Sequence, residues 1–199
     1  LIDPYQPAGD LTITELDSLG NILKDNKEYT RQLDLSKAIA SVSRISEGIN
    51  IKREFFASQG SLGNICIRLS AGKPICWKLQ LSRIQDKDCN ISAFSDSTER
   101  RIVLHGEFVG DSHFTVAVHI ASTDGNPEFS EDSAEVLIKN AKTVTAFLAI
   151  GATDKSNNPD SEAYNYETCD FETVFKEHAK LYGESFNNCR VDIRCENSS

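Results

Sequence analysis

The stretch from Leu33 to Leu69 decides the fold, and it contains the runs AIASVSRI (38–45), INIKREFFAS (49–58) and ICIRL (65–69). Apolar and polar residues alternate within each run, as in a strand whose successive side chains point to opposite faces. Turn residues separate the runs, with Ser46-Glu47-Gly48 after the first and Gln59-Gly60 after the second. The stretch therefore predicts three consecutive antiparallel strands, a β-meander.

Similar short runs continue on both sides of the meander. We expect further strands at residues 11–16, 75–81, 101–108, 113–120, 134–138 and 142–150. Ser70–Pro74 predicts a turn that joins two strands into a hairpin, and Asp86–Arg100 predicts a loop or a weak edge strand. Many short strands with little helix indicate an all-β fold, an antiparallel two-sheet β-sandwich.

The C-terminal part has a different period. Apolar side chains recur there at three- and four-residue spacing, and Asp170 is suited to cap the start of a helix. We expect one C-terminal amphipathic helix over 170–186, whose apolar face packs on the sandwich or on a partner. The candidate partners are a missing catalytic chain and a second copy of this chain. The expected organisation is a β-sandwich domain at 1–152, a linker at 153–169, and a helix and tail at 170–199.

Composition limits the partners. The formal net charge of −9 repels phosphate backbones and the basic residues are scattered, so we expect no nucleic-acid partner. No apolar run approaches the roughly 18 to 20 residues of a membrane-spanning helix, so we expect no membrane partner. The chain contains no methionine, and we interpret Leu1 as a processed or trimmed terminus.

Cysteines and glycosylation motifs favour a secreted, extracellular glycoprotein. The disulfide candidates are Cys66, Cys76, Cys89, Cys169, Cys189 and Cys195. The expected hairpin brings Cys66 near Cys76, where a bridge forms only in a favourable register, and the alternative is two buried thiols. Asn90 and Asn197 begin the two N-glycosylation motifs.

Other chemistry-bearing residues are interpreted as structural. The sequence has no C-x-x-C pair, and its four histidines are too dispersed for a metal site, so we expect no metal and no cofactor. Trp77 flanks an apolar face, and we expect it to be a core residue rather than a sugar platform.

Several motifs, taken in order, resemble one enzyme family. They are YQPAGDL (5–11), YTRQLDL (29–35), REFFAS (53–58), RLSAGKP (68–74), and finally His178, Tyr182, Phe186 and Arg190-Val191. They resemble the N-terminal β-supersandwich and helical linker of glycoside hydrolase family 95, which includes α-L-fucosidases and α-L-galactosidases. The resemblance covers most of the chain and implies a supersandwich fold.

The resemblance assigns no catalytic residue, because that family carries its catalytic acid and base in an (α/α)₆ barrel after the linker. Glycoside hydrolysis needs two carboxylates positioned around the bond, and none of the 30 acidic residues is marked by its context. We therefore expect a secreted non-catalytic module that binds carbohydrate or another ligand, or is structural, with its ligand-binding residues unassigned. The alternatives are a processed fragment of an active α-L-fucosidase-like hydrolase and a carrier of a small apolar ligand between the sheets.

Overall fold

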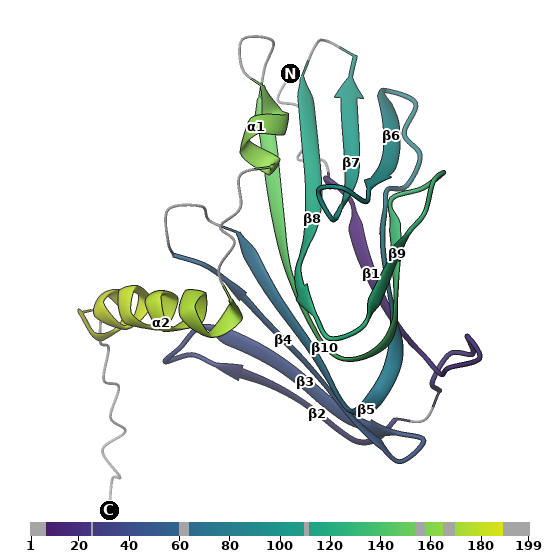
Figure 1. The fold of residues 1–199 in the computed structure, drawn as a ribbon. Helices are drawn as coiled ribbons and strands as arrows, with labels where there is room; N and C mark the ends of the chain where they lie inside the picture. Colours follow the sequence, from purple (N-terminus) through teal and green to yellow (C-terminus); the bar gives the residue numbers. More distant parts are fainter. Residues whose placement is uncertain are drawn as a thin grey trace, which may run out of the picture.

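The structure is a computed structural model that describes residues 7–24, 26–59, 64–109, 112–153, 158–164 and 170–188. Its strands form one antiparallel sheet in the order β2-β3-β4-β5-β10-β8-β7-β6, with β1 also on β5 and β9 also on β10 (Figure 1). The strands are β1 (Asp10–Leu16), β2 (Lys27–Asp34), β3 (Ile39–Ser46), β4 (Ile49–Ala57), β5 (Ile65–Ser82), β6 (Cys89–Asp96), β7 (Arg101–Phe108), β8 (His113–Thr123), β9 (Asn126–Phe129) and β10 (Glu135–Thr153). The prediction of an all-β antiparallel fold is confirmed.

Two long strands fold this sheet into layers. Both β5 and β10 bend near their middles, at the bottom of Figure 1, so each contributes to both layers. Their first and second halves have different neighbours: residues 65–71 of β5 pair with β4, whereas residues 76–82 pair with β1. The β10 strand has register shifts between Ile138 and Thr143, where it bends. The sequence predicts a sandwich of two sheets, whereas the structure has one connected sheet whose two long strands fold it into two layers.

The predicted turn at Ser70–Pro74 is wrong, because β5 runs through it without a break. The pairing explains why proline is tolerated there. The last pair with β4 is at Ala71 and the first with β1 is at Cys76. Pro74 lies between them, where its missing N–H interrupts no paired position. The turn-like composition marks a change of partner strand within one strand.

The core lies between the two layers. Alternate residues of the predicted meander, Ile49 and Ile51 on β4 and Ile67 and Leu69 on β5, point into it. Trp77 is 0% exposed, and its indole N–H donates to the carbonyl of Ala141 at 3.3 Å. Trp77 is thus a core residue, as predicted. We call the core-facing side of β2–β5 the inner face and its opposite side the outer face.

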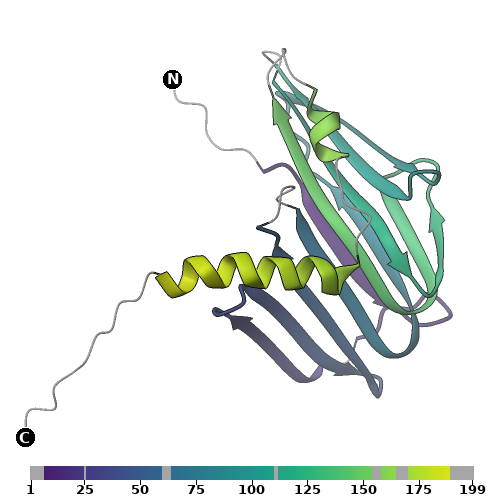
Figure 2. The same ribbon diagram turned by 60° about the vertical axis from the view of Figure 1, so that its left-hand side comes forward.

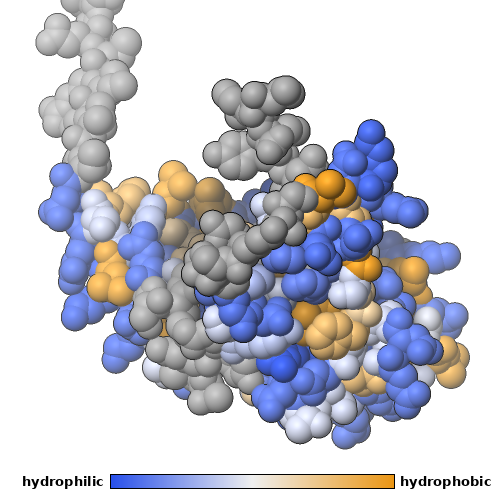
Figure 3. All heavy atoms as spheres, turned by 90° about the horizontal axis from the view of Figure 1, so that it is seen from above, coloured by the Kyte–Doolittle hydropathy of each residue, from blue (hydrophilic) through white to orange (hydrophobic). Residues whose placement is uncertain are grey.

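Two helices follow the last strand. Helix α1 (Pro159–Ala163) lies inside the segment expected to be a linker, and it packs on β10 and β8. Helix α2 (Phe171–Asn188) crosses the outer face of β2–β5 (Figure 2). Seen from above, the described surface is largely hydrophilic, with hydrophobic side chains in separate groups (Figure 3). Neither helix is long and apolar enough to cross a membrane within the described residues.

Candidate ligand-binding surface

Helix α2 begins where the sequence predicts and packs on the sandwich itself. The Asp170 carboxylate accepts the Thr173 backbone N–H at 3.0 Å and its hydroxyl at 2.7 Å, which caps the helix. The Phe171 ring meets Phe56 of β4 edge-on, with centroids 5.2 Å apart. His178 is 1% exposed, stacks on Phe56 at 4.8 Å and contacts the Lys37 carbonyl oxygen at 3.0 Å through Nε2. The first half of α2 therefore covers part of the outer face.

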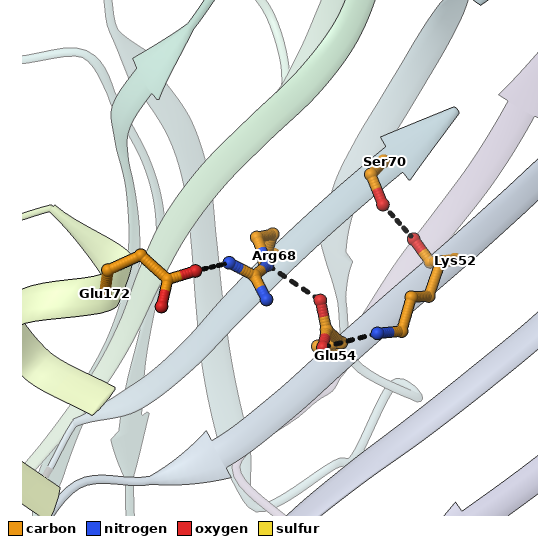
Figure 4. A network of polar contacts seen from close by, with 5 residues as sticks. All are labelled: Lys52, Glu54, Arg68, Ser70 and Glu172. Carbon is orange, nitrogen blue, oxygen red and sulfur yellow. Dashed lines mark hydrogen bonds and ion pairs between the residues drawn. The ribbon is translucent and has the colours of Figure 1, made fainter. Parts of the chain in front are cut away.

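Beside this apolar contact lies a chain of charged side chains (Figure 4). The Glu54 carboxylate on β4 accepts a hydrogen bond from Arg68 Nε at 2.7 Å and another from Lys52 Nζ at 2.8 Å. Arg68 also donates to Glu172 in the first turn of α2, and its guanidinium lies 4.1 Å from the Phe171 ring centroid. One arginine therefore joins β4, β5 and α2.

The environment of Glu54 fixes its ionisation state. Burial acts to raise its pKa, but the hydrogen bonds and charges of Arg68 and Lys52 outweigh burial, so the pKa lies below its usual range. A general acid in glycoside hydrolysis needs the reverse, a carboxyl whose pKa is raised enough to keep its proton. Glu54 therefore has the chemistry of a structural carboxylate.

A hollow of about 490 Å³ opens on the outer face next to this charged chain. Paired strand positions supply its wall: Thr30 lies opposite Ser43, Ser43 opposite Lys52, and Lys52 opposite Ser70. We call it the outer hollow, and its polar lining comprises Glu28, Thr30, Ser43, Arg44, Asn50, Lys52 and Ser70. Hydroxyl, amide and charged groups on firmly paired strands provide hydrogen-bond donors and acceptors at fixed positions.

A second hollow of about 300 Å³ lies at the open edge of the sandwich. There Glu15 of β1 is 4% exposed and is held by two arginines of the opposite layer. Arg44 lies 3.1 Å from Glu15 Oε2, and Arg53 Nε lies 2.7 Å from Oε1. No local sequence pattern indicates this cluster, because Arg44 and Arg53 are 29 and 38 residues from Glu15.

The histidines are distributed as predicted in part. His105 contacts the Thr115 hydroxyl at 2.9 Å, and that hydroxyl donates to Asp160 of α1 at 2.6 Å. A carboxylate therefore lies close to His105, with Asp160 Oδ1 3.8 Å from His105 Nδ1, because α1 folds back onto β8. His113 stacks on His105 with ring centroids 6.0 Å apart. Within the described ranges, no group of three or more ligating side chains is arranged to hold a metal ion.

The proposed Cys66–Cys76 disulfide is contradicted. Both residues are free and buried, and they lie ten positions apart on the single strand β5 rather than across a hairpin. Cys89 is also a free, buried thiol, and burial raises the pKa of Cys66 to about 12, so this thiol stays protonated and unreactive. Cys169, Cys189 and Cys195 lie outside the described residues.

The described residues include only one of the two glycosylation motifs. Asn90 is exposed on β6, a strand at the end of the sheet order, so the edge-strand alternative for this segment is the correct one. Asn197 lies outside the described residues.

Comparison with known proteins identifies the domain type. A family model described as "Glycosyl hydrolase family 65, N-terminal domain" matches residues 2–157. The chain belongs to this family. A solved structure described as "Putative kojibiose phosphorylase from human microbiome" aligns with this family 65 N-terminal domain at a TM-score of 0.59 and 14% identity. The alignment covers 85% of this chain and 27% of that one, so this chain spans about a quarter of that protein. No curated protein matches the sequence.

These matches confirm the expected N-terminal glycoside hydrolase domain, but they support family 65 rather than family 95. The motifs behind the family 95 resemblance, such as REFFAS on β4 and RLSAGKP on β5, lie on sandwich strands. Their alternation and burial are features of a sandwich strand, so these motifs indicate the type of sandwich rather than one hydrolase family.

Proposed function

We propose that this family 65 N-terminal domain is a non-catalytic module that binds neutral carbohydrate in the outer hollow. The observation that carries the proposal is the polar wall of that hollow, in which Thr30 of β2, Ser43 of β3 and Ser70 of β5 present hydroxyls from one face of the sheet. A sugar is recognised by such groups because each of its hydroxyls both donates and accepts hydrogen bonds. The Lys52–Glu54–Arg68 chain holds the strands beneath the hollow in place, so less conformational entropy is lost when a ligand binds.

The non-catalytic part rests on the carboxylates of the described residues. Glu15 and Glu54 are the acidic residues that the described sandwich buries, and each is held by two cationic side chains. Such pairing occupies both carboxylates, and it holds the pKa of Glu54 below its usual range, whereas hydrolysis needs one protonated and one free carboxyl across a bond.

The test is a titration of isotopically labelled protein with neutral oligosaccharides, followed by NMR. We expect amide shifts at Thr30, Ser43 and Ser70, and their loss in Ser70→Leu, which fills the hollow with an apolar side chain. Ser97→Leu, which changes an exposed serine in the turn after β6, is the matched control and should leave the shifts intact. Shifts that persist in Ser70→Leu, or no binding across the panel, would refute the proposed site.

A second candidate function is that the chain is one part of an active α-L-fucosidase-like hydrolase. The observation that favours it is the end of α2, where Tyr182 and Phe186 continue the ring stack and Phe186 remains 43% exposed. Gel filtration and intact mass of natural material, with a 4-nitrophenyl α-L-fucoside assay, separate the two. A co-purifying chain and release of 4-nitrophenol support the enzyme, whereas a single chain of about the 22.0 kDa sequence mass without release supports the module.

Two further proposals concern secretion and the binding of apolar ligands. Secretion is supported by the exposed Asn90 motif, and a mass shift on glycosidase treatment of natural material would test it. A carrier of apolar ligands is less well supported, because Trp77, Leu69 and Ile120 fill the space between the layers. Both described hollows instead have polar side chains in their linings.

A further inference from the structure

The open edge of the sandwich concentrates positive charge in a protein whose net charge is −9. Arg44 and Arg53 extend from the inner face of β3 and β4 and share the single carboxylate of Glu15. Arg53 also donates to the carbonyl of Ile13 at 3.0 Å, and Arg44 donates to the Asn26 side chain at 2.7 Å. These bonds fix both guanidinium groups, because a side chain with two partners has little rotamer freedom left.

A third arginine joins them through the strand register. Arg31 of β2 pairs with Val42 of β3, and Val42 pairs with Arg53 of β4. Directly paired residues place their side chains on the same side of a sheet, so Arg31 lies on the inner face two strands from Arg53, with Val42 between them. Arg31 is exposed, and the described residues supply no ion pair to it. Three arginines, Arg31, Arg44 and Arg53, therefore lie on the inner face of adjacent strands.

Arg44 and Arg53 line the hollow of about 300 Å³ at the open edge, which we call the arginine groove, and Arg31 lies on the same face of the sheet, across from the lining residue Val42. Val42 and Ile51 contribute apolar surface to its lining, and Tyr29 stands beside them with 56% of its surface exposed. An aromatic ring next to fixed guanidinium groups suits a ligand that has both a flat ring face and a negative group. The groove has Arg44 and Ile51 in common with the lining of the outer hollow, but Tyr29, Val42 and Arg53 line the groove alone.

We propose that the arginine groove binds an oxyanion carried on a sugar ring, such as the carboxylate of a uronic acid in an acidic oligosaccharide. Arg31 and the outward side of Arg53 bind the oxyanion, and Tyr29 stacks on the ring. Arginine suits this role because its planar fork matches a carboxylate with two parallel hydrogen bonds. A free oxyanion such as inorganic phosphate shares the charge chemistry but has no ring for Tyr29. The inference does not depend on carbohydrate binding in the outer hollow.

The test compares three probes by calorimetry on the full chain: a galacturonic acid oligomer, a neutral glucose oligomer of the same length, and inorganic phosphate. We expect the acidic oligomer to bind and to weaken as salt is added, because exposed charges are screened. Arg31→Gln and Tyr29→Ala should each weaken it by about tenfold. Lys142→Gln, an exposed cation on β10 outside the groove, is the charge-matched control and should leave it unchanged.

Both variants change exposed side chains and leave the Glu15 cluster intact, so they should fold, and a circular dichroism melt verifies this. If phosphate binds as well as the acidic oligomer and Tyr29→Ala has no effect, the sugar part of the proposal is overturned. Absence of binding by both anions, or equal losses in Arg31→Gln and Lys142→Gln, overturns it entirely. Ser70→Leu should not alter this binding and Arg31→Gln should not alter that of neutral sugars, so the two sites succeed or fail separately.

Discussion

Replacing Arg68 with methionine should loosen α2 and destabilise the sandwich by about 2 to 3 kcal/mol. The Arg68 side chain is 26% exposed and Glu54 is 9% exposed, so their pair is largely removed from water. Removing one partner of a fully buried pair costs roughly 3 to 5 kcal/mol, and partial exposure together with the remaining Lys52 contact reduces that cost. The contact of Arg68 with the Phe171 ring adds about 0.5 to 1 kcal/mol.

Urea unfolding of wild type and Arg68→Met, followed by circular dichroism, gives the free-energy difference. Glu172→Gln is the control, because Glu172 is 70% exposed and its bond to Arg68 should contribute at most about 1 kcal/mol. Hydrogen exchange of the α2 amides should rise more in Arg68→Met than in Glu172→Gln.

The difference in unfolding free energy between wild type and Arg68→Met should also depend on pH. The pKa of Glu54 is lowered in the folded protein, so its stabilisation is present above the ordinary pKa of about 4.3 and is lost as pH falls through the folded value. The gap between wild type and Arg68→Met should therefore narrow in acid. A loss below about 0.5 kcal/mol, or one as large in Glu172→Gln, would refute the view that Arg68 joins the helix to the sheet.

Three further changes test other parts of the fold. Phe56→Ala removes the ring between Phe171 and His178 and should lower the free energy of unfolding, measured in urea, by about 3 to 5 kcal/mol. Hydrogen exchange of the α2 amides should rise first, and unchanged exchange would contradict the packing of α2 on Phe56. Gly151→Ala would place its Cβ 2.1 Å from the Pro159 carbonyl oxygen, so it should displace α1 and lower the free energy of unfolding by about 1 to 3 kcal/mol. In the control Gly72→Ala, the new Cβ meets Asn50 only at 3.7 Å, and the loss should be under about 1 kcal/mol. Burial lowers the pKa of His119 to about 4. Folding stability should therefore fall as pH drops from about 6.5 to about 4, because the unfolded chain binds the proton first. His119→Gln should flatten that part of a stability–pH curve, and an unchanged slope would contradict the lowered pKa of His119.

The elements with a regular period were predictable from sequence. Alternation in INIKREFFAS places Ile49 and Ile51 inward and Lys52 and Glu54 outward, and the structure has that arrangement. The helix was equally readable, because Asp170 caps it and its apolar residues recur along one side. Local periodicity is sufficient where one face of a strand or helix is buried.

The remaining features depend on contacts between distant residues. Ser70–Pro74 has turn composition, yet it is part of β5. Its composition reflects a change of partner, because pairing with β4 ends at Ala71 and pairing with β1 begins at Cys76. The bonds of Glu15 to Arg53 and of Thr115 to Asp160 require the register of the layers and the return of α1, and neither leaves a local pattern. The charged chain beside α2 and the arginine groove were missed for the same reason.

The central claim is that this glycoside hydrolase N-terminal domain binds carbohydrate at the outer hollow without cleaving it. One NMR experiment tests it directly: labelled protein is mixed with neutral oligosaccharides while the sugar signals are followed over time. The account predicts shifts at Thr30, Ser43 and Ser70, their loss in Ser70→Leu, and sugar signals that stay constant. New reducing-end signals, or shifts confined to residues outside the hollow, would contradict it.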